Sequence, residues 1–128
     1  MTPAKAAAAG ERIAKICLTL PETTEEVHGD HRTFRIGKAK KVFAYFLNNH
    51  HGDGIVSLCC KVAPGDNTWL ANAQPARYYL PAYIGPRGWV GLRVDQGRID
   101  WDEVSELVKD SYRRTAPAKL AVTVRVAE

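Results

Sequence analysis

The order of apolar and polar residues along the chain predicts one helix followed by an antiparallel meander of short strands. Over residues 4–18 good helix formers dominate, and apolar side chains recur at helical spacing up to Pro21, which ends the pattern. After it, short apolar or β-branched runs alternate with glycine-containing turns. The runs are residues 24–28, 33–36, 41–47 and 54–62.

The second half of the chain predicts two more helices and one more strand. A short helix is expected at 68–74, an ordered loop at the proline- and glycine-rich residues 78–87, and a strand at 89–95. Asp100 can cap the last long helix, with Glu103 as the partner in a capping box. The apolar stripe of that helix is Trp101, Val104, Leu107, Val108 and Tyr112.

The tail is ambiguous. Residues 117–120 suit a helix start, whereas the later apolar residues alternate as in a strand. The alternating residues are Leu120, Val122, Val124 and Val126. We favour a short helix.

Alternation along the strands sorts their side chains onto two faces. One face is apolar and should pack against the helices. It holds Val27, Phe34, Ile36, Val56, Leu58, Cys60, Val62, Val90, Leu92 and Val94. The opposite face should carry Glu26, His28, Thr33, Arg35, Ser57, Cys59, Lys61, Trp89 and Arg93. Residues 41–47 are apolar on both sides, with Phe43, Tyr45 and Leu47 on one and Val42, Ala44 and Phe46 on the other.

Cations and aromatic rings therefore share the second face. Arg35, Lys61 and Arg93 could contact phosphates, while Trp89 or Tyr45 stacks on a base or another planar ligand. The alternative is that long cationic side chains only solvate an exposed sheet. Arg87, beside Trp89 in the glycine-containing stretch 85–88, adds another cation.

Composition indicates one globular domain spanning residues 1–128, with 45% hydrophobic and 25% charged residues. The net charge of +4 and the pI near 9.1 should attract phosphates or acidic proteins at low salt. The compact basic run is Lys38, Lys40 and Lys41. Because the chain lacks a long apolar run and the apolar centre of a signal peptide, we expect a cytoplasmic protein with no membrane partner. The odd set Cys17, Cys59 and Cys60 argues against a disulfide scaffold.

Catalytic and metal sites find little support in the sequence. His28 with His31, and His50-His51 with Asp53, lack a matching second pair of ligands, so we expect no metal and no cofactor. Cys59 needs a nearby base such as His28 to act as a nucleophile, and packing is its simpler role. Tyr83 and Tyr112 are expected to pack the loop and the last helix onto the sheet. No catalytic residue is predicted, and we expect a protein that is not an enzyme.

Several stretches of the chain resemble the MmcQ/YjbR family. They are Leu20-Pro21-Glu22 with Glu25-Glu26-Val27-His28-Gly29, Thr33-Phe34-Arg35-Ile36-Gly37, Lys41-Val42-Phe43-Ala44, residues 81–90, Asp100-Trp101-Asp102-Glu103-Val104 and Ser111-Tyr112-Arg113. The resemblance implies an α+β fold, an antiparallel β-sheet with helices packed mainly on one face, similar to frataxin-like or secretion-chaperone-like architectures. It also implies DNA binding through a double-wing arrangement. The first helix lacks the acidic ridge of a frataxin-like metal site.

Two binding functions stay open at this point, beside an enzymatic one that rests only on His28 and Cys59. The first is non-enzymatic DNA binding, with wings at the hairpin tips 37–41 and 48–54. The second is a small-ligand or protein-binding module, with an aromatic, basic groove in which His28, Arg87 and Trp89 converge and an acidic protein as one class of partner. The binding candidates for the two are His28, Arg35, Lys40, Lys41, Tyr45, Lys61, Arg87, Trp89 and Arg93.

Overall fold

The computed structural model describes residues 1–125. The helices are α1 (Pro3–Leu18), α2 (Asp66–Ala73), α3 (Trp101–Thr115) and α4 (Ala118–Ala121), with short 3-10 helices η1 (His50–Gly52) and η2 (Gly85–Arg87). The strands are β1 (Thr23–His28), β2 (His31–Ile36), β3 (Lys41–Asn48), β4 (Val56–Lys61), β5 (Tyr78–Tyr79) and β6 (Trp89–Arg93). The predicted order of elements is confirmed, with β5 as a two-residue edge strand inside the predicted loop.

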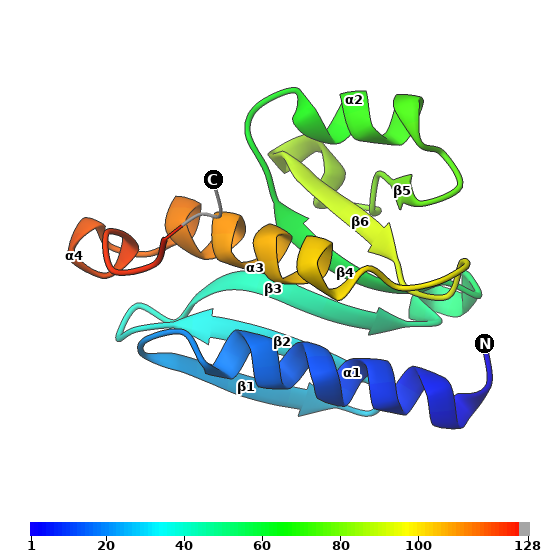
Figure 1. Ribbon diagram of the computed structural model, residues 1–128, viewed down its shortest axis with the longest axis horizontal. Helices are drawn as coiled ribbons and strands as arrows, with labels where there is room; N and C mark the ends of the chain where they lie inside the picture. The colour runs from blue at the N-terminus through cyan, green and yellow to red at the C-terminus, as the bar shows by residue number, and fades with distance from the viewer. Residues whose placement is uncertain (126–128) are drawn as a thin grey trace.

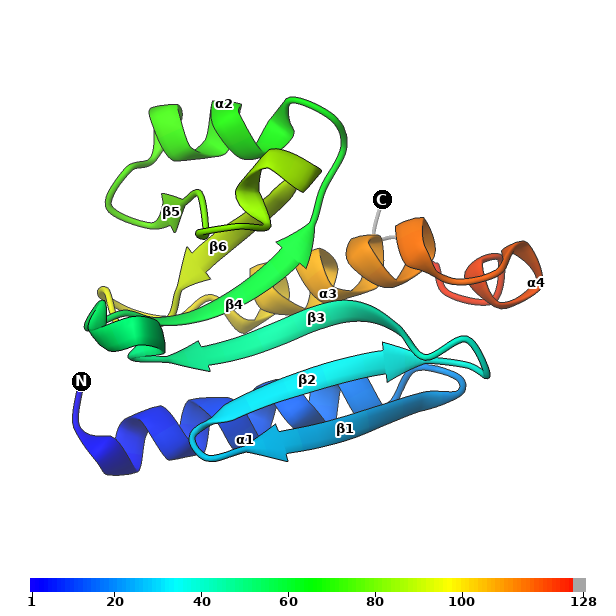
Figure 2. The same cartoon turned by 180° about the vertical axis from the view of Figure 1, so that it is seen from behind.

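The strands form one antiparallel sheet in the order β1-β2-β3-β4-β6-β5. Helices α1 and α3 lie side by side across one face, as Figure 1 shows from the helix side and Figure 2 from behind. Helix α2 packs beside β5 and β6 at the far edge. The fold is therefore α+β with helices mainly on one face, as the sequence predicts.

The two long helices begin at polar caps. Thr2 accepts a hydrogen bond from the amide of Lys5 at the start of α1, and Asp100 accepts from the amides of Asp102 and Glu103 at the start of α3. Glu103 itself does not complete a capping box. Its carboxylate pairs with Arg77 and accepts a hydrogen bond from the Tyr78 hydroxyl at 3.1 Å, so it ties α3 to the chain around β5.

The core fills the space between the helices and the apolar face of the sheet. Its largest fully buried side chains are Tyr112, Phe34, Phe43, Phe46, Ile13, Ile36, Leu58, Val90, Val94, Val104, Val108 and Cys17. Val27 lies on the predicted face but outside the core. It pairs with Arg32 near the end of edge strand β1 and is 58% exposed. The Arg32 side chain on the same face reaches α1 and pairs with Glu11 at 2.7 Å.

An irregularity in β3 changes which residues of that strand are buried. The pairing of β2 with β3 shifts register between Phe34 and Arg35, leaving Phe43 as the extra residue. Phe43 and Ala44 are consequently both fully buried, and the Phe43 ring packs edge-on against Tyr112 at 5.5 Å. The predicted placement of Phe43 on the second face with Tyr45 is therefore wrong, since simple alternation does not anticipate a bulge.

The buried hydroxyl of Ser111 connects α3 to two strands. It donates to the carbonyl oxygen of Phe43 at 2.6 Å and accepts from the amide of Lys61 at 2.9 Å. Both backbone groups lie where β3 and β4 stop pairing with each other, and the Ser111 hydroxyl is the hydrogen-bond partner of both.

Part of the second sheet face is also covered. The ring of Tyr79 lies directly over Gly91, where any added Cβ would come within 2.3 Å of it. The Tyr79 hydroxyl bonds to that of Ser57 at 2.7 Å, so Ser57 and Cys59 beneath it are fully buried. Glycine at position 91 is what allows this close approach.

The tail forms α4 over residues 118–121, as favoured above, and not a strand. Val126 lies outside the described residues. Within residues 1–125, no helix is both long and apolar enough to cross a lipid bilayer.

Replacing Ser111 with alanine should destabilise the fold by roughly 1–3 kcal/mol, because a buried carbonyl and a buried amide would both lose their partner. Urea unfolding followed by circular dichroism measures the change. Ser105→Ala, at a half-buried position on the same helix, is the control and should shift the unfolding free energy by less than about 0.5 kcal/mol. Equal losses in the two variants would contradict the bridging role.

Acid stability should depend on the pair between Arg93 and Asp95. Burial alone would raise the pKa of Asp95, but hydrogen bonds from Arg93 and from the amide of Val56 outweigh it and lower that pKa. A carboxyl with a lowered folded-state pKa contributes stability above its unfolded pKa of about 3.9 and loses it as the pH falls. Arg93→Gln should therefore cost roughly 1–3 kcal/mol at neutral pH and move acid unfolding to higher pH.

An acid titration followed by circular dichroism checks this shift. Arg98→Gln removes the same charge from an exposed arginine nearby and serves as the control. Coincident acid midpoints for the two variants would rule out the Arg93–Asp95 contribution.

Candidate functional site

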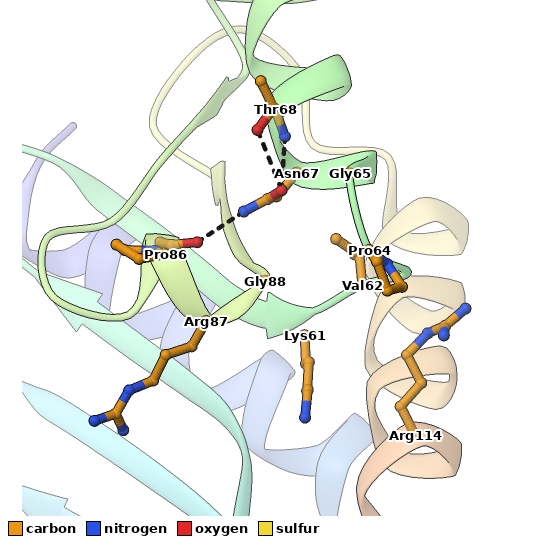
Figure 3. Close-up of a pocket in the computed structure, with 11 residues that line it drawn as sticks. Lys61, Val62, Pro64, Gly65, Asn67, Thr68, Pro86, Arg87, Gly88 and Arg114 are labelled. Atoms are coloured by element: carbon orange, nitrogen blue, oxygen red, sulfur yellow. Dashed lines mark hydrogen bonds between the residues drawn. The ribbon is translucent and has the colours of Figure 1, made fainter.

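An open pocket of about 690 Å³ lies where the end of β4, the start of α2, η2 and the end of α3 meet (Figure 3). Its lining residues are Lys61, Val62, Pro64, Gly65, Asn67, Thr68, Gly85, Pro86, Arg87, Gly88 and Arg114. Three of these are cationic, and none of these described lining residues is acidic. We call this site the basic pocket.

The side chain of Asn67 holds two walls of the basic pocket together. It is buried, and its amide nitrogen donates to the carbonyl oxygens of Gly85 at 2.9 Å and Trp89 at 3.1 Å. Its amide oxygen accepts from the backbone of Thr68 at 2.8 Å. Gly88, with φ of 89°, ends η2 in the left-handed region and accepts a hydrogen bond from the amide of Val62. These bonds fix the pocket's shape without a ligand.

The three cations reach the basic pocket from three different elements. Lys61 is the last residue of β4, Arg87 the last of η2, and Arg114 lies in the last turn of α3, as Figure 3 shows. Arg114 pairs with Asp110 on its own helix at 2.8 Å. Within residues 1–125, Lys61 and Arg87 are exposed and have no carboxylate partner. Their charges can therefore neutralise a bound anion.

The β2–β3 hairpin adds more positive charge at the same end of the sheet. Its residues Lys38, Lys40 and Lys41 are exposed, and β3 begins here just as β4 ends at Lys61. Figures 1 and 2 both place this hairpin at the end of the molecule that carries α4 and the last turn of α3. We call the hairpin lysines and the pocket cations together the basic end.

Two of the predicted phosphate-binding arginines are engaged within the fold. Arg35 pairs with Glu26 at 2.9 Å and donates to the carbonyl oxygen of Lys40 at 3.1 Å, so it supports the hairpin backbone. The hydrogen bond from Arg35 lowers the pKa of Glu26. Arg93 forms two hydrogen bonds with Asp95. These arginines were predicted to be available to a ligand. In the structure, each one instead pairs with a carboxylate at a nearby position.

The predicted stacking surface is also mostly absent. Trp89 is only 8% exposed, because its ring packs against Tyr45 at a centroid distance of 5.4 Å. Tyr45 is half-buried and lines a different pocket on the same sheet face. The pair therefore stabilises the second face near β4 and β6 rather than presenting an aromatic surface to solvent.

His28 does not converge with Arg87 and Trp89. It lies on edge strand β1, where it pairs with His31 and contacts Glu26 at 3.5 Å. Four strand spacings separate β1 from β6, which corresponds to about 19 Å. The predicted groove is therefore wrong, although His28 and Trp89 do occupy the same face of the sheet.

Cys59 and His28 are likewise apart. Three strand spacings, about 14 Å, separate β1 from β4. Cys59 is fully buried beneath Tyr79, and burial raises its pKa to about 11. Among residues 1–125, no group of three or more histidine, cysteine or acidic side chains is arranged to hold a metal ion.

The two hairpin tips proposed as wings lie at opposite ends of the sheet. Strand β3 connects them, and its eight residues span about 25 Å. The second tip carries His50, His51 and Asp53 rather than lysines. The two tips were predicted as consecutive turns of one meander. Consecutive turns of an antiparallel meander lie at opposite ends of the sheet.

Sequence reasoning missed the α2 side of the basic pocket and Arg114. The turn Pro64-Gly65 before α2 marks a helix start, but nothing in it shows that Asn67 faces η2. In the sequence, the position of Arg114 near the end of a helix is a sufficient reason for its charge, because cations interact favourably with the helix dipole there. Lys61, Arg87, Lys40 and Lys41 were predicted, and the fold brings them to one end.

Comparisons with known proteins support the sequence resemblance. The YjbR family model matches residues 18–114. The structure is similar to the crystal structure of Deinococcus radiodurans protein DR2400, which has a DUF419 domain, with a TM-score of 0.65 and 23% sequence identity over 82% of this chain and 76% of that one. No curated protein matches the chain at a significant level. The match over most of the chain, on the same α+β fold, shows that this protein belongs to the YjbR family.

Proposed function

We propose that this protein binds DNA at its basic end and catalyses no reaction on it. The observation that supports this proposal best is the basic pocket, which Lys61 and Arg87 line from different elements without a described carboxylate partner. A protein does not gain stability from gathering unpaired like charges, since they repel one another. Their presence on one pocket is understandable if an anion binds beside them.

The shape of the basic end suits a polyanion better than a single small anion. In this proposal one phosphate binds in the pocket near the N-terminus of α2, where the helix dipole favours an anion and Asp66 in the first turn partly offsets that effect. The lysines of the β2–β3 hairpin extend the positive surface beyond the pocket, where neighbouring phosphates of a strand would lie. In this proposal the hairpin acts as one wing, and the loops around α2 and η2 take the place of the second.

The free state of the thiols fits the cytoplasmic setting that we propose for this function. Cys17, Cys59 and Cys60 are buried and unpaired, which is typical of proteins that fold in a reducing compartment.

Lys61→Ala combined with Arg87→Ala should weaken DNA binding by one to two orders of magnitude near 0.1 M salt, because each phosphate contact contributes roughly tenfold there through counterion release. The slope of log affinity against log salt should fall by roughly two units. Fluorescence anisotropy of labelled single-stranded and duplex DNA across a salt series measures both quantities.

The matched control is Lys5→Ala combined with Arg98→Ala, which removes two exposed cations near the N-terminus of α1, away from the basic end. It should leave the affinity within about threefold, as expected for charges outside the contact surface. Equal effects of the two double variants would mean that only net charge matters and would sink the assignment. Competition by polyglutamate as strong as that by unlabelled DNA would instead identify acidic proteins as the partner.

A further inference from the structure

The second sheet face holds another pocket, of about 370 Å³, at the end of the sheet opposite to the hairpin lysines of the basic end. Its floor is formed by Tyr45 and Leu47 on β3 and by Tyr79 on β5. The chain after β5, from Pro81 to Ile84, forms one side, and the β3–β4 loop with His50, His51 and Asp53 forms the other. The volume lies in the range of sites for small organic ligands.

The distribution of atoms in this pocket distinguishes an apolar floor from a polar rim. Aromatic and aliphatic carbon lies below, while the imidazoles of His50 and His51 and the carboxylate of Asp53 lie on one side only. The His50 and His51 rings are tilted against each other at a centroid distance of 3.9 Å, and His51 meets the ring of Tyr83 edge-on at 6.4 Å. A ligand with flat apolar faces and a polar edge matches such a surface.

Residues on two sides of the same pocket adopt strained backbone conformations. His51 has φ of 54° and Tyr83 φ of 68°, which place both non-glycine residues in the left-handed region. Tyr83 is moreover 81% exposed, so packing within the fold does not offset the free-energy cost of this backbone conformation. The prediction that Tyr83 packs the loop onto the sheet is therefore wrong. Strained, exposed residues that face a pocket are characteristic of ligand-binding clamps.

The geometry points to a binding site for a nucleobase, a planar heteroaromatic ring with N–H donors on its edge. The ring lies over the apolar floor and stacks on the exposed ring of Tyr83, while the His51 imidazole, which meets Tyr83 edge-on, faces its edge. Asp53 is the one acidic residue of the rim and accepts from the ring's N–H groups. One of its oxygens also accepts from the amide of Ile55 at 2.9 Å, which holds the carboxylate in place.

This site is separate from the basic pocket and does not rest on DNA binding there. The segment between the two contributes Pro81, Ala82, Tyr83 and Ile84 to one pocket and the residues from Gly85 to Gly88 to the other. A nucleobase could come from a free nucleoside or nucleotide, or from a nucleic-acid strand. Both sources present the same ring.

Isothermal titration calorimetry with adenosine and guanosine tests the site, with ribose as the ring-free control. At least one nucleoside should bind saturably, and ribose should not. Tyr83→Ala should weaken that binding by about tenfold or more, while Tyr83→Phe keeps the ring and the affinity. Trp69→Ala, at an aromatic residue that is 65% exposed on α2 and outside the pocket, should change nothing. Asp53→Asn should weaken binding while keeping an oxygen for the amide of Ile55.

The failure of this proposal is distinguishable from that of DNA binding. Lys61→Ala with Arg87→Ala should leave nucleoside affinity unchanged, because a nucleoside has no phosphate. A parallel titration with a short oligodeoxyadenylate separates the sources: a loss of its affinity in Tyr83→Ala indicates a base from a strand, and an unchanged affinity indicates a free nucleoside or nucleotide. No binding of either nucleoside to the unaltered protein, or equal binding to the Tyr83→Ala variant, would overturn the site.

Discussion

The hydroxyl of Ser111 is the contact through which the hydrophobic core and the basic pocket depend on one another. The bulge in β3 turns Phe43 into the core and leaves its carbonyl oxygen for Ser111. The same hydroxyl holds the amide of Lys61, the residue at which β4 ends and from which a pocket cation projects. Since Arg114 follows one turn later on α3, packing of that helix positions two of the three pocket cations together.

Much of the fold could be predicted from sequence because its signals are local. Asp100 with the stripe from Trp101 to Tyr112 specifies the last long helix, and glycine turns separate the strands of the meander. The bulge at Phe43 could not be foreseen, since it arises from the packing of Tyr112 and Ser111 against the strand. Similarly, the role of Glu103 depends on Arg77, which only the fold brings near.

The sequence predicted which types of residue form the candidate site better than it predicted how they are arranged in space. Lys61 lies at the end of a strand and Arg87 lies in a glycine-containing turn. Both residues line the basic pocket. Arg35 and Arg93 have the same chemistry, yet each finds a carboxylate within a few residues or across one strand. Alternation assigns a side chain to a face, but it does not say which neighbour pairs with it or, as for Trp89, which ring covers it.

The buried thiols give the chain internal reporters of its own opening motions. A thiol reacts as its thiolate, and burial raises the pKa of Cys17, Cys59 and Cys60 while shielding each sulfur from reagents. Cys59 lies beneath Tyr79, whereas Cys17 and Cys60 lie in the core between helix and sheet. Modification of Cys59 therefore records the lifting of the segment that covers the second face, and modification of the other two records the separation of the helices from the sheet.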